Sequence, residues 1–239
     1  MVARVARFYD ANTSGPTGAV SSVLLMADVD QPRLAGAVLR PFSAFAEVIG
    51  QEDRLGKHFP ATVANGGLYF WLTTGTAFQL ATTQLFCDGL ESRGVLTAER
   101  RPDVELVLHE ALANALLHGN LGLDSGLRDD FMQYERFCQL LDERLHDPVA
   151  SQLRVEMAAT WTEDLLEVTI SDEGDGFTMP NKSGPNKSGP NKSGSSDTDT
   201  EGTDADEPSI LHGLDIIRAL TTGIAASDEG RCITVRFAR

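Results

Sequence analysis

One segment in the middle of the chain spaces three polar side chains by the repeat of a helix. Residues 107–120 read VLHEALANALLHGN, in which Glu110, Asn114 and His118 are four residues apart. Positions four apart lie on one face of an α-helix, so these side chains are expected to point the same way. A carboxylate and an amide oxygen on one face suit a magnesium ion, which prefers oxygen ligands.

A second segment, further along the chain, combines acidic residues with glycine. Residues 171–177 read SDEGDGF, and Asp172, Gly174 and Gly176 follow an apolar run typical of a strand. Glycine lets backbone approach a ligand closely because it carries no Cβ. Each segment has a plainer interpretation, a solvated helix face and a tight hairpin loop. The presence of both in one chain favours a site for Mg²⁺ and a nucleotide.

The elements that must position these residues are predicted from apolar periodicity. A helix is expected over residues 102–117, and strands over 153–159 and 165–171 are expected to form a hairpin. A helix over 214–220 and a strand over 232–237 follow near the end of the chain. The polar helix face and the glycine turn would then lie at the ends of neighbouring elements.

The first part of the chain is predicted to be a separate appendage. Residues 20–50 indicate a strand, a helix and a strand, followed by a short strand over 58–63 and a helix over 68–89. The run LLMADVDQPRLAGAVL resembles the opening of a response-regulator receiver domain, with Asp28 and Asp30 where such domains bind Mg²⁺. Residues 1–57 are too few for a complete receiver, so we expect a truncated, receiver-like appendage that packs or pairs.

An amphipathic helix is predicted over residues 127–145. Its apolar residues are spaced alternately four and three apart, with charged residues on the opposite face. Two interpretations stay open: a helix that packs on its own domain, or a seam for a partner or for a second copy of the chain in a homodimer. The apolar stripe consists of Leu127, Phe131, Tyr134, Cys138, Leu141 and Leu145.

Composition limits the classes of function. The 239 residues carry a net charge of −15, which argues against direct binding of nucleic acid or of an anionic membrane. Neither a membrane-spanning run nor a signal-peptide core is recognised, so a cytoplasmic location is expected. Cys87, Cys138 and Cys232 show no metal-binding spacing and are interpreted as reduced, buried thiols in the core.

The motifs and the order of the elements resemble the ATPase domain shared by gyrase, histidine kinases and MutL-type proteins (the GHKL superfamily). The HGN ending of the Glu-Ala-x-x-Asn-Ala helix is most similar to the bacterial anti-sigma-factor serine kinases. The resemblance covers residues 58–239, with a helical insertion over 124–148. It implies a two-layer α/β sandwich, in which helices cover one face of a mixed, mainly antiparallel sheet (a Bergerat-type ATPase fold), and ATP and Mg²⁺ as cofactors.

The resemblance also implies a role for each motif residue. Asn114 matches the residue that binds Mg²⁺ through its side-chain oxygen, and Asp172 matches the one that accepts a hydrogen bond from the adenine amino group. Glu110 matches the residue that orients and deprotonates the attacking hydroxyl in the serine kinases. His118 is grouped with the nucleotide-binding residues and is expected to cap the helix end.

Further matches involve glycines and the last strand. Gly174 and Gly176 would let the backbone pass close to the nucleotide. Gly213 and Leu214 stand at the second glycine box, whose backbone N–H groups face phosphate in the family. Leu211 stands where this box has its first glycine. Thr234 matches a threonine that supports the adenine-binding aspartate.

A lid over the phosphates is implied for residues 178–210. Residues 181–194, NKSGPNKSGPNKSG, repeat a five-residue unit, and an acidic run over 195–208 follows. This composition cannot bury a core, so disorder is expected.

The resulting functional hypothesis is an ATP-dependent protein serine/threonine kinase of the anti-sigma type. Its expected partners are an antagonist protein, which it phosphorylates, and a sigma factor or comparable regulator. One alternative is a nucleotide-binding pseudokinase that acts as an interaction module without turnover. A second alternative is a histidine-phosphotransfer component of a two-component system.

Overall fold

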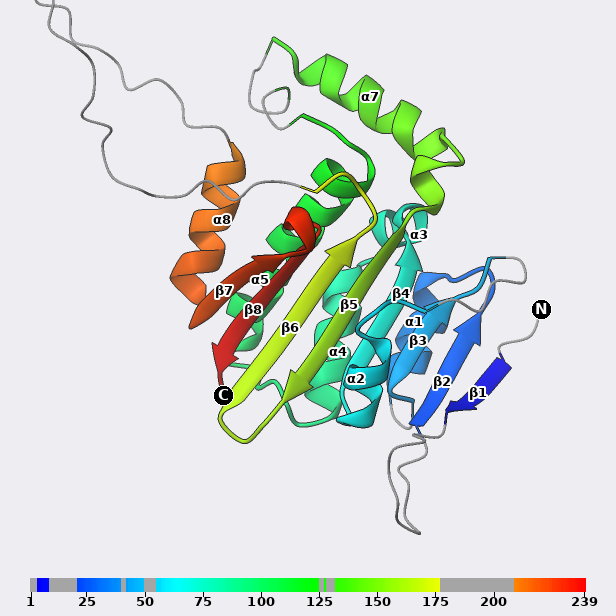
Figure 1. The fold of residues 1–239 in the computed structure, drawn as a ribbon, viewed down its shortest axis with the longest axis vertical. Helices are drawn as coiled ribbons and strands as arrows, with labels where there is room; N and C mark the ends of the chain where they lie inside the picture. The colour runs from blue at the N-terminus through cyan, green and yellow to red at the C-terminus, as the bar shows by residue number, and fades with distance from the viewer. Residues whose placement is uncertain are drawn as a thin grey trace, which may run out of the picture.

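The computed structural model describes residues 4–8, 21–39, 42–49, 55–124, 127, 132–176 and 209–239. Its centre is an eight-stranded mixed sheet in the order β1-β2-β3-β4-β5-β6-β8-β7 (Figure 1). Strand β3 pairs in parallel with β2 and β4, and the remaining pairings are antiparallel. The strands are β1 (Arg4–Phe8), β2 (Ser21–Met26), β3 (Ala44–Glu47), β4 (Leu68–Thr73), β5 (Arg154–Trp161), β6 (Leu165–Asp172), β7 (Gly223–Ser227) and β8 (Cys232–Ala238).

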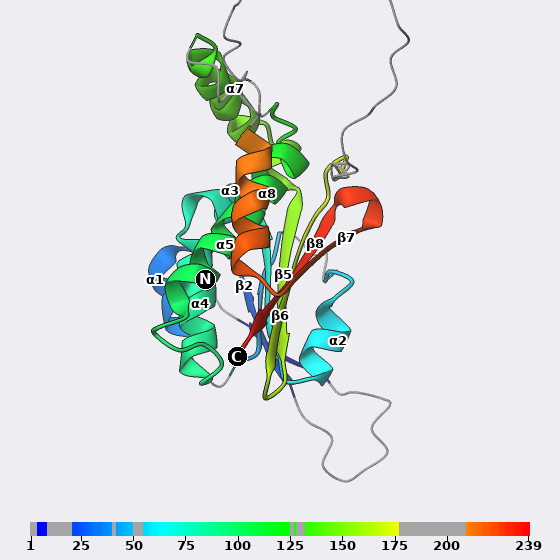
Figure 2. The same cartoon turned by 90° about the vertical axis from the view of Figure 1, so that its left-hand side faces the viewer.

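Helices cover one face of this sheet, as the fold class requires. In the edge-on view, α1, α4, α5 and α8 lie together on one side of the strands, and the short helix α2 lies on the other (Figure 2). The expected mixed sheet with helices over one face is confirmed. The helices are α1 (Gln31–Val38), α2 (Phe59–Ala64), α3 (Thr74–Gln79), α4 (Thr82–Ser92), α5 (Arg101–Ala113), α7 (Tyr134–His146) and α8 (Ser209–Leu220), with short η1 (Asn114–Asn120), η2 (Ala150–Gln152) and η3 (Asp228–Gly230).

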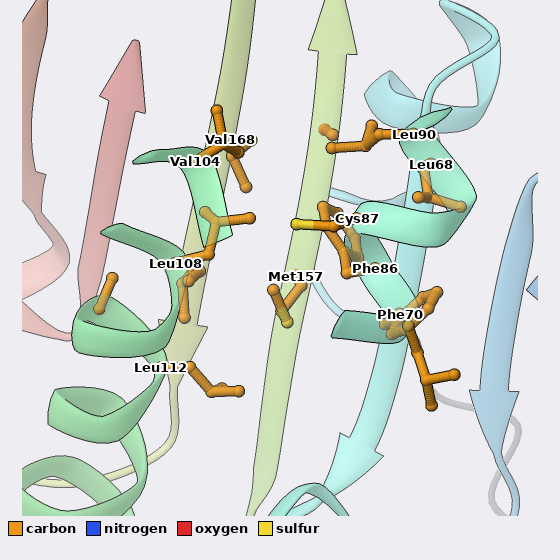
Figure 3. Packing of buried hydrophobic residues seen from close by; sticks show 14 of the residues in the cluster. Leu68, Phe70, Phe86, Cys87, Leu90, Val104, Leu108, Leu112, Met157 and Val168 are labelled. Carbon is orange, nitrogen blue, oxygen red and sulfur yellow. The ribbon is translucent and has the colours of Figure 1, made fainter. Parts of the chain in front are cut away.

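The main core fills the space between the helices and the sheet. Side chains of α4, including Phe86 and Leu90, and of α5, including Val104 and Leu108, point onto the strands (Figure 3). The ring centroids of Phe86 and Phe70 lie 5.0 Å apart, edge to face. This packing fixes α5, the helix that carries the polar motif, against β5 and β6.

Strand β4 overturns the prediction of a helix over residues 68–89. All six of its residues are buried. Phe70 and Leu72 enter the core under α4 and α5, whereas Tyr69 and Trp71 pack with α2 on the opposite face. A strand buried on both faces is an uninterrupted apolar run and loses the alternation that identifies strands. The helices α3 and α4 begin only after it.

Helix α2 corrects the prediction of a strand over residues 58–63. The helix begins at Phe59, with His58 as the N-cap residue and proline in its first turn. Proline is tolerated there because the first amides of a helix have no partner within the helix. Phe59 and Val63 close the second, smaller core over Tyr69 and Trp71.

The N-terminal strands extend the sheet of the rest of the chain. Strand β3 pairs in parallel with β4, with Phe45 opposite Phe70. Leu24, Leu34 and Phe45 belong to the same buried cluster as the residues of α4 and α5. Within the segment expected to form an appendage, residues 1–57, the described strands thus continue the sheet of the rest of the chain.

Helix α7 packs on its own domain at one end of the sheet. Phe137 is buried against Leu121 and Leu123, with Leu141 and Leu145 partly buried beside it. Tyr134 and Cys138, two members of the predicted stripe, are exposed instead. The buried face is therefore rotated from the predicted one, and the interpretation of Cys138 as a core residue is wrong.

Two further predictions concern the lid and membrane-spanning helices. Residues 178–208 of the expected lid lie outside them. Within the described ranges, none of the helices combines the length and the apolar character needed to cross a bilayer.

Candidate nucleotide-binding site

The acidic glycine turn begins where β6 ends. The backbone N–H of Asp172 donates to the carbonyl of Arg231 at 2.9 Å, which holds the end of β6 beside β8. The N–H of Gly174 donates to Asp172 Oδ1 at 3.0 Å. Burial raises the pKa of Asp172 to about 6, although the Gly174 N–H and the Arg231 guanidinium oppose the shift. At pH 7 the group is mainly a carboxylate, an acceptor that is only partly solvated.

Glycines allow the turn and the polar helix to touch. A Cβ added to Gly119 would lie 2.5 Å from Asp172 Oδ1, and one added to Gly174 would overlap the Gly119 carbonyl. Gly176 has φ +79°, a backbone conformation that favours glycine, and faces the Glu229 carbonyl. Gly174 and Gly176 thus bring the turn close to the backbone of Gly119 and Glu229, and their approach to a nucleotide stays a prediction.

The polar helix changes its geometry at the site. Helix α5 ends at Ala113, and Asn114–Asn120 forms a π-helix, in which the N–H of Leu121 donates to the carbonyl of Leu116 at 2.9 Å. Such wider turns are rare and often occur at functional sites. The predicted helix over 102–117 is thus confirmed as helical, but its last turn is wider than an α-helical one.

His118 lies near the end of this π-helix. Its Nδ1 is 2.6 Å from the carbonyl oxygen of Leu123. A carbonyl can only accept, so Nδ1 carries the proton and Nε2 is an acceptor whenever the ring is neutral. The contact fixes the ring at the helix end, where it also lines the cavity described below.

Asn120 joins the segments that build the site. Its Nδ2 donates to Thr74 Oγ1 at 2.8 Å and to the Arg154 carbonyl at 3.0 Å. Its Oδ1 accepts the backbone N–H of Glu173 at 2.8 Å. One buried amide therefore connects the π-helix to α3, to β5 and to the glycine turn.

Helix α8 brings the second glycine segment to the polar face of α5. A Cβ added to Gly213 would lie 2.8 Å from Glu110 Oε2 and 4.0 Å from Asn114 Nδ2. Glu110, Asn114 and Gly213 are thus neighbours, although α8 follows α5 by about a hundred residues. The Leu214 side chain points into the core and is fully buried.

A narrow cavity lies between the π-helix and the ends of β6 and β8. Its volume is about 40 Å³, little more than the space of one water molecule in the liquid. Apolar residues from both strands and the polar motif residues share its walls. It is lined by Ala111, Asn114, Ala115, His118, Gly119, Ile170, Asp172, Gly176, Gly230, Arg231 and Ile233.

Other parts of the molecule are separate from this cavity. Thr234 faces the opposite side of the sheet, where its Oγ1 lies 3.0 Å from Thr169 Oγ1, so the structure does not bring it to Asp172. Its neighbour Ile233 occupies the cavity wall instead. A larger, open hollow of about 790 Å³ lies between α3, α4 and α5 and contains none of the predicted site residues.

The residues present suit an adenine nucleotide. Ile170 and Ile233 offer apolar walls for a base, and the Asp172 carboxylate offers an acceptor at the edge of that apolar region. The contact of Gly119 with this carboxylate leaves no room for a side chain between the helix and the acceptor. A helix-backed sheet with such a site defines an ATP-binding domain.

Comparison with known families assigns this domain. The model of the histidine kinase-like ATPase domain (HATPase_c_2) matches residues 73–237, and the chain belongs to this family. No curated protein matches the sequence. The matched region omits β1, β2 and β3, which the structure joins to the same sheet.

Several residues of the site were not predicted from the sequence. Gly119 and Asn120 belong to the HGN ending, but their contacts connect segments far apart in the chain. Arg231 reaches the cavity from the turn before β8, and Ile170 and Ile233 reach it through strand alternation. Their side of the sheet could have been inferred from the buried Val168 and Val235, which share it.

Proposed function

We propose that this ATP-binding domain is a protein serine/threonine kinase of the anti-sigma type. It transfers the γ-phosphoryl group of ATP to a serine or threonine of an antagonist protein, and so controls a sigma factor or a similar regulator by partner switching. One observation carries the proposal: the Glu110 carboxylate lies one helical turn before Asn114 and beside the backbone of Gly213. A carboxylate at this position can orient a hydroxyl group that attacks the γ-phosphorus and accept its proton.

Nucleotide recognition is assigned to the two motifs. Asp172 accepts a hydrogen bond from the adenine amino group, and Ile170 and Ile233 contact the faces of the base. His118 and the backbone of Gly119, Gly174 and Gly176 enclose it. The pKa of Asp172, about 6, keeps this acceptor ionised at pH 7.

Magnesium binding is assigned to Asn114. Among the described residues there is no group of three or more His, Cys, Asp or Glu side chains arranged to hold a metal ion. An ion at Asn114 would therefore take its remaining oxygen ligands from the nucleotide phosphates and water, as Mg²⁺ commonly does. When bound, Mg²⁺ supplies positive charge that neutralises the phosphates during transfer.

Glu110 is assigned the role of positioning residue and base for the acceptor hydroxyl. The hydroxyl proton passes to the carboxylate while the hydroxyl oxygen bonds to the γ-phosphorus and the bond to ADP breaks. The backbone of Gly213 and Leu214, which lies within α8, is assigned to the phosphate side. The position of Glu110 beside Asn114 and Gly213 favours a kinase that transfers the phosphoryl group over a protein that only binds the nucleotide.

A nucleotide-binding regulator without turnover is the second candidate. The narrow cavity favours it, because a space of about 40 Å³ must widen before a nucleotide enters. Leu211 in place of a glycine in the second glycine box also favours it. Both candidates require ATP binding, and they differ in phosphoryl transfer.

Phosphoryl transfer separates the candidates. The protein is incubated with γ-labelled ATP, Mg²⁺ and candidate antagonists, alongside Glu110→Gln and the exposed control Glu135→Gln. We expect acid-stable phosphate on the antagonist with wild type and with the Glu135 variant, and at least a hundredfold less with Glu110→Gln at unchanged ATP affinity. Binding of ATP without any transfer favours the regulator. Acid-labile phosphate on the protein itself favours histidine phosphotransfer.

A further inference from the structure

A series of hydrogen-bonded side chains lies on the face of the sheet away from the main helical layer. His58 Nδ1 is 2.8 Å from Glu156 Oε2, and the same ring hydrogen-bonds Cys232. The three residues come from the start of α2, from β5 and from β8, and they are far apart in the chain. A thiol, an imidazole and a carboxylate in this order are the parts of a nucleophilic cysteine site.

Sheet register fixes the thiol and the carboxylate on one face. Glu156 pairs with Ser171, and Ser171 pairs with Cys232, so the three are neighbours in one row across β5, β6 and β8. Val155 and Ile233, adjacent to this row along their strands, enter the core on the opposite face. Glu156 and Cys232 therefore point toward α2 and away from the nucleotide cavity.

The carboxylate is held rigidly. Glu156 is 2% exposed, and its Oε1 accepts the backbone N–H of His58 at 2.9 Å while Oε2 contacts the ring of the same residue. The Tyr69 hydroxyl also hydrogen-bonds Glu156 and accepts the N–H of Gly56 at 3.0 Å. A buried carboxylate with this many partners orients the imidazole and keeps it charged.

Electrostatics favour an ion pair between the ring and the thiol. The hydrogen bonds to Cys232 and Glu156 raise the pKa of His58 to about 9, despite its partial burial. Burial acts to raise the pKa of Cys232, but the hydrogen bonds with His58 and Ser227 and the nearby positive charges bring it below the ordinary thiol value. Both shifts favour transfer of the thiol proton to the imidazole, and the resulting thiolate is the nucleophilic form.

We propose that Cys232 is a nucleophilic thiol site for hydrogen peroxide or another small hydroperoxide, with His58 as proton donor and Glu156 as the residue that positions His58. The assignment does not depend on the kinase function. Cys232 is 2% exposed, whereas the His58 side chain is 29% exposed, so a reagent reaches the sulfur past the imidazole. A hollow of about 610 Å³, lined in part by Gly56 and Glu156, opens beside the row. The sulfur itself is almost fully buried, so only small reagents are expected to reach it.

The reaction is a two-electron oxidation of sulfur. The Cys232 thiolate attacks one oxygen of the peroxide, the S–O bond forms and the O–O bond breaks. The leaving hydroxide or alkoxide takes the imidazolium proton of His58. The products are a sulfenic acid, a neutral imidazole, and water or an alcohol.

Other charged groups surround the site and contribute to its pH dependence. Lys57 pairs with Asp228 at 2.7 Å, at the η3 turn next to Cys232. The guanidinium of Arg154 lies over the Trp71 ring at 5.8 Å. The titratable and charged groups that face the ion pair are Lys57, Tyr69, Arg154, Glu156, Asp228 and Arg231.

The other two cysteines supply controls within the same molecule. Cys138 is exposed on α7, and Cys87 is buried in the apolar core, where burial raises its pKa to about 12. The native protein is treated with hydrogen peroxide between pH 6 and 9, sulfenic acid is trapped with a small 1,3-dione, and each cysteine is quantified by peptide mass spectrometry. A bulky maleimide is used in parallel to measure access.

We expect Cys232 to oxidise at least tenfold faster than Cys138 at pH 6.5 and with little change up to pH 8. An ordinary thiol is only about 1% thiolate at pH 6.5, so its rate should rise about tenfold per pH unit. The bulky maleimide should modify Cys138 first, and Cys87 should stay unmodified by either reagent. In His58→Gln, Cys232 oxidation should slow at least tenfold at pH 6.5 and regain its rate above pH 9.

The wild-type measurement decides the proposal without any variant. A Cys232 rate that rises tenfold per pH unit, as expected of an ordinary thiol, overturns it. So does a Cys232 that stays reduced while Cys138 is oxidised across the whole range. Protection of Cys87 in His58→Gln shows that the variant is folded. An unchanged Cys232 rate in that folded variant also contradicts the role of His58.

Discussion

Replacement of Asn120 by alanine should destabilise the domain and loosen the nucleotide site together. The Asn120 amide makes hydrogen bonds to Thr74 Oγ1, to the Arg154 carbonyl and to the Glu173 N–H, at 2.8, 3.0 and 2.8 Å. Alanine removes all three bonds and leaves their partners without the amide. Because Glu173 belongs to the acidic glycine turn, the loss reaches the position of Asp172.

The magnitude follows from these three bonds. A hydrogen bond contributes about 1 kcal/mol net to stability, and a buried group left unpaired costs about 1–3 kcal/mol. Glu173 is exposed, so water can satisfy its N–H, whereas Thr74 is buried. We therefore expect the free energy of unfolding to fall by about 3 kcal/mol, a large part of the stability of an ordinary domain. Asn120→Asp keeps the shape but turns an oxygen toward the Arg154 carbonyl, so it should cost at least as much.

Urea unfolding measures the loss, read from the midpoint at constant slope. The control is Asn65→Ala, which removes an exposed bond from Asn65 Nδ2 to the Ala61 carbonyl and should change stability by less than about 0.5 kcal/mol. An Asn120→Ala protein within 1 kcal/mol of wild type would refute the reasoning. An Asn120→Asp protein as stable as wild type would show that shape, not hydrogen bonding, matters there.

Three further predictions concern the nucleotide site. The folded-state pKa of Asp172, about 6, lies above the ordinary value of 3.8, so the ionised group costs stability that is regained as the pH falls from 6 toward 4. After discounting for partial solvation, Asp172→Asn should gain about 1 kcal/mol in urea unfolding at pH 7 and nothing below pH 4. An equal gain at both pH values would contradict the shift. Gly119→Ala should weaken ATP binding at least tenfold in calorimetry, because its methyl group would displace the Asp172 carboxyl. The control Gly36→Ala, whose methyl group meets open space, should leave ATP affinity unchanged. Equal ATP affinities in the two variants would contradict the contact. ATP should alter amide hydrogen exchange in residues 114–119, which belong to the wall of the narrow cavity, and in α8, whose Gly213 lies beside Glu110 and Asn114, but not in β4. Unchanged exchange in α8 would show that the nucleotide enters without moving this helix.

The sequence carries information on local spacing more completely than on contacts between distant segments. Glu110, Asn114 and His118 follow one helical repeat, and the hairpin of β5 and β6 follows from two alternating runs. Both are local patterns. The structure contains the hairpin and the helix, but residues 114–120 form a π-helix. The π-helical turn has no such pattern, because its hydrogen bonds skip one residue more than those of an α-helix.

Strand β4 and helix α2 were predicted wrongly, for different reasons. Strand β4 packs against α4 and α5 on one face and against α2 on the other, so its sequence lacks alternation. Helix α2 is only six residues long, too short for a helical repeat to be distinguished from a strand. Sequence alone also could not place Thr234, because one step along β8 separates the face of the cavity from the opposite one.

The series of His58, Glu156 and Cys232 illustrates the same limit. His58 and Glu156 lie 98 residues apart and were not connected by any motif. Only the register of β5, β6 and β8 brings the carboxylate and the thiol into one row. Asn120 likewise acquires its importance from partners in three other segments.

The central claim is that ATP binds between the π-helix and the end of β6, with Asp172 on the adenine and Asn114 on the metal. Isothermal titration of ATP and GTP, with and without Mg²⁺, tests it most directly in wild type, Asp172→Asn and Asn114→Ala. We predict that wild type prefers ATP and binds it more tightly with Mg²⁺. Asp172→Asn should lose the preference for adenine, and Asn114→Ala should lose the dependence on Mg²⁺. Unchanged affinity, preference and Mg²⁺ dependence in both variants would contradict the site.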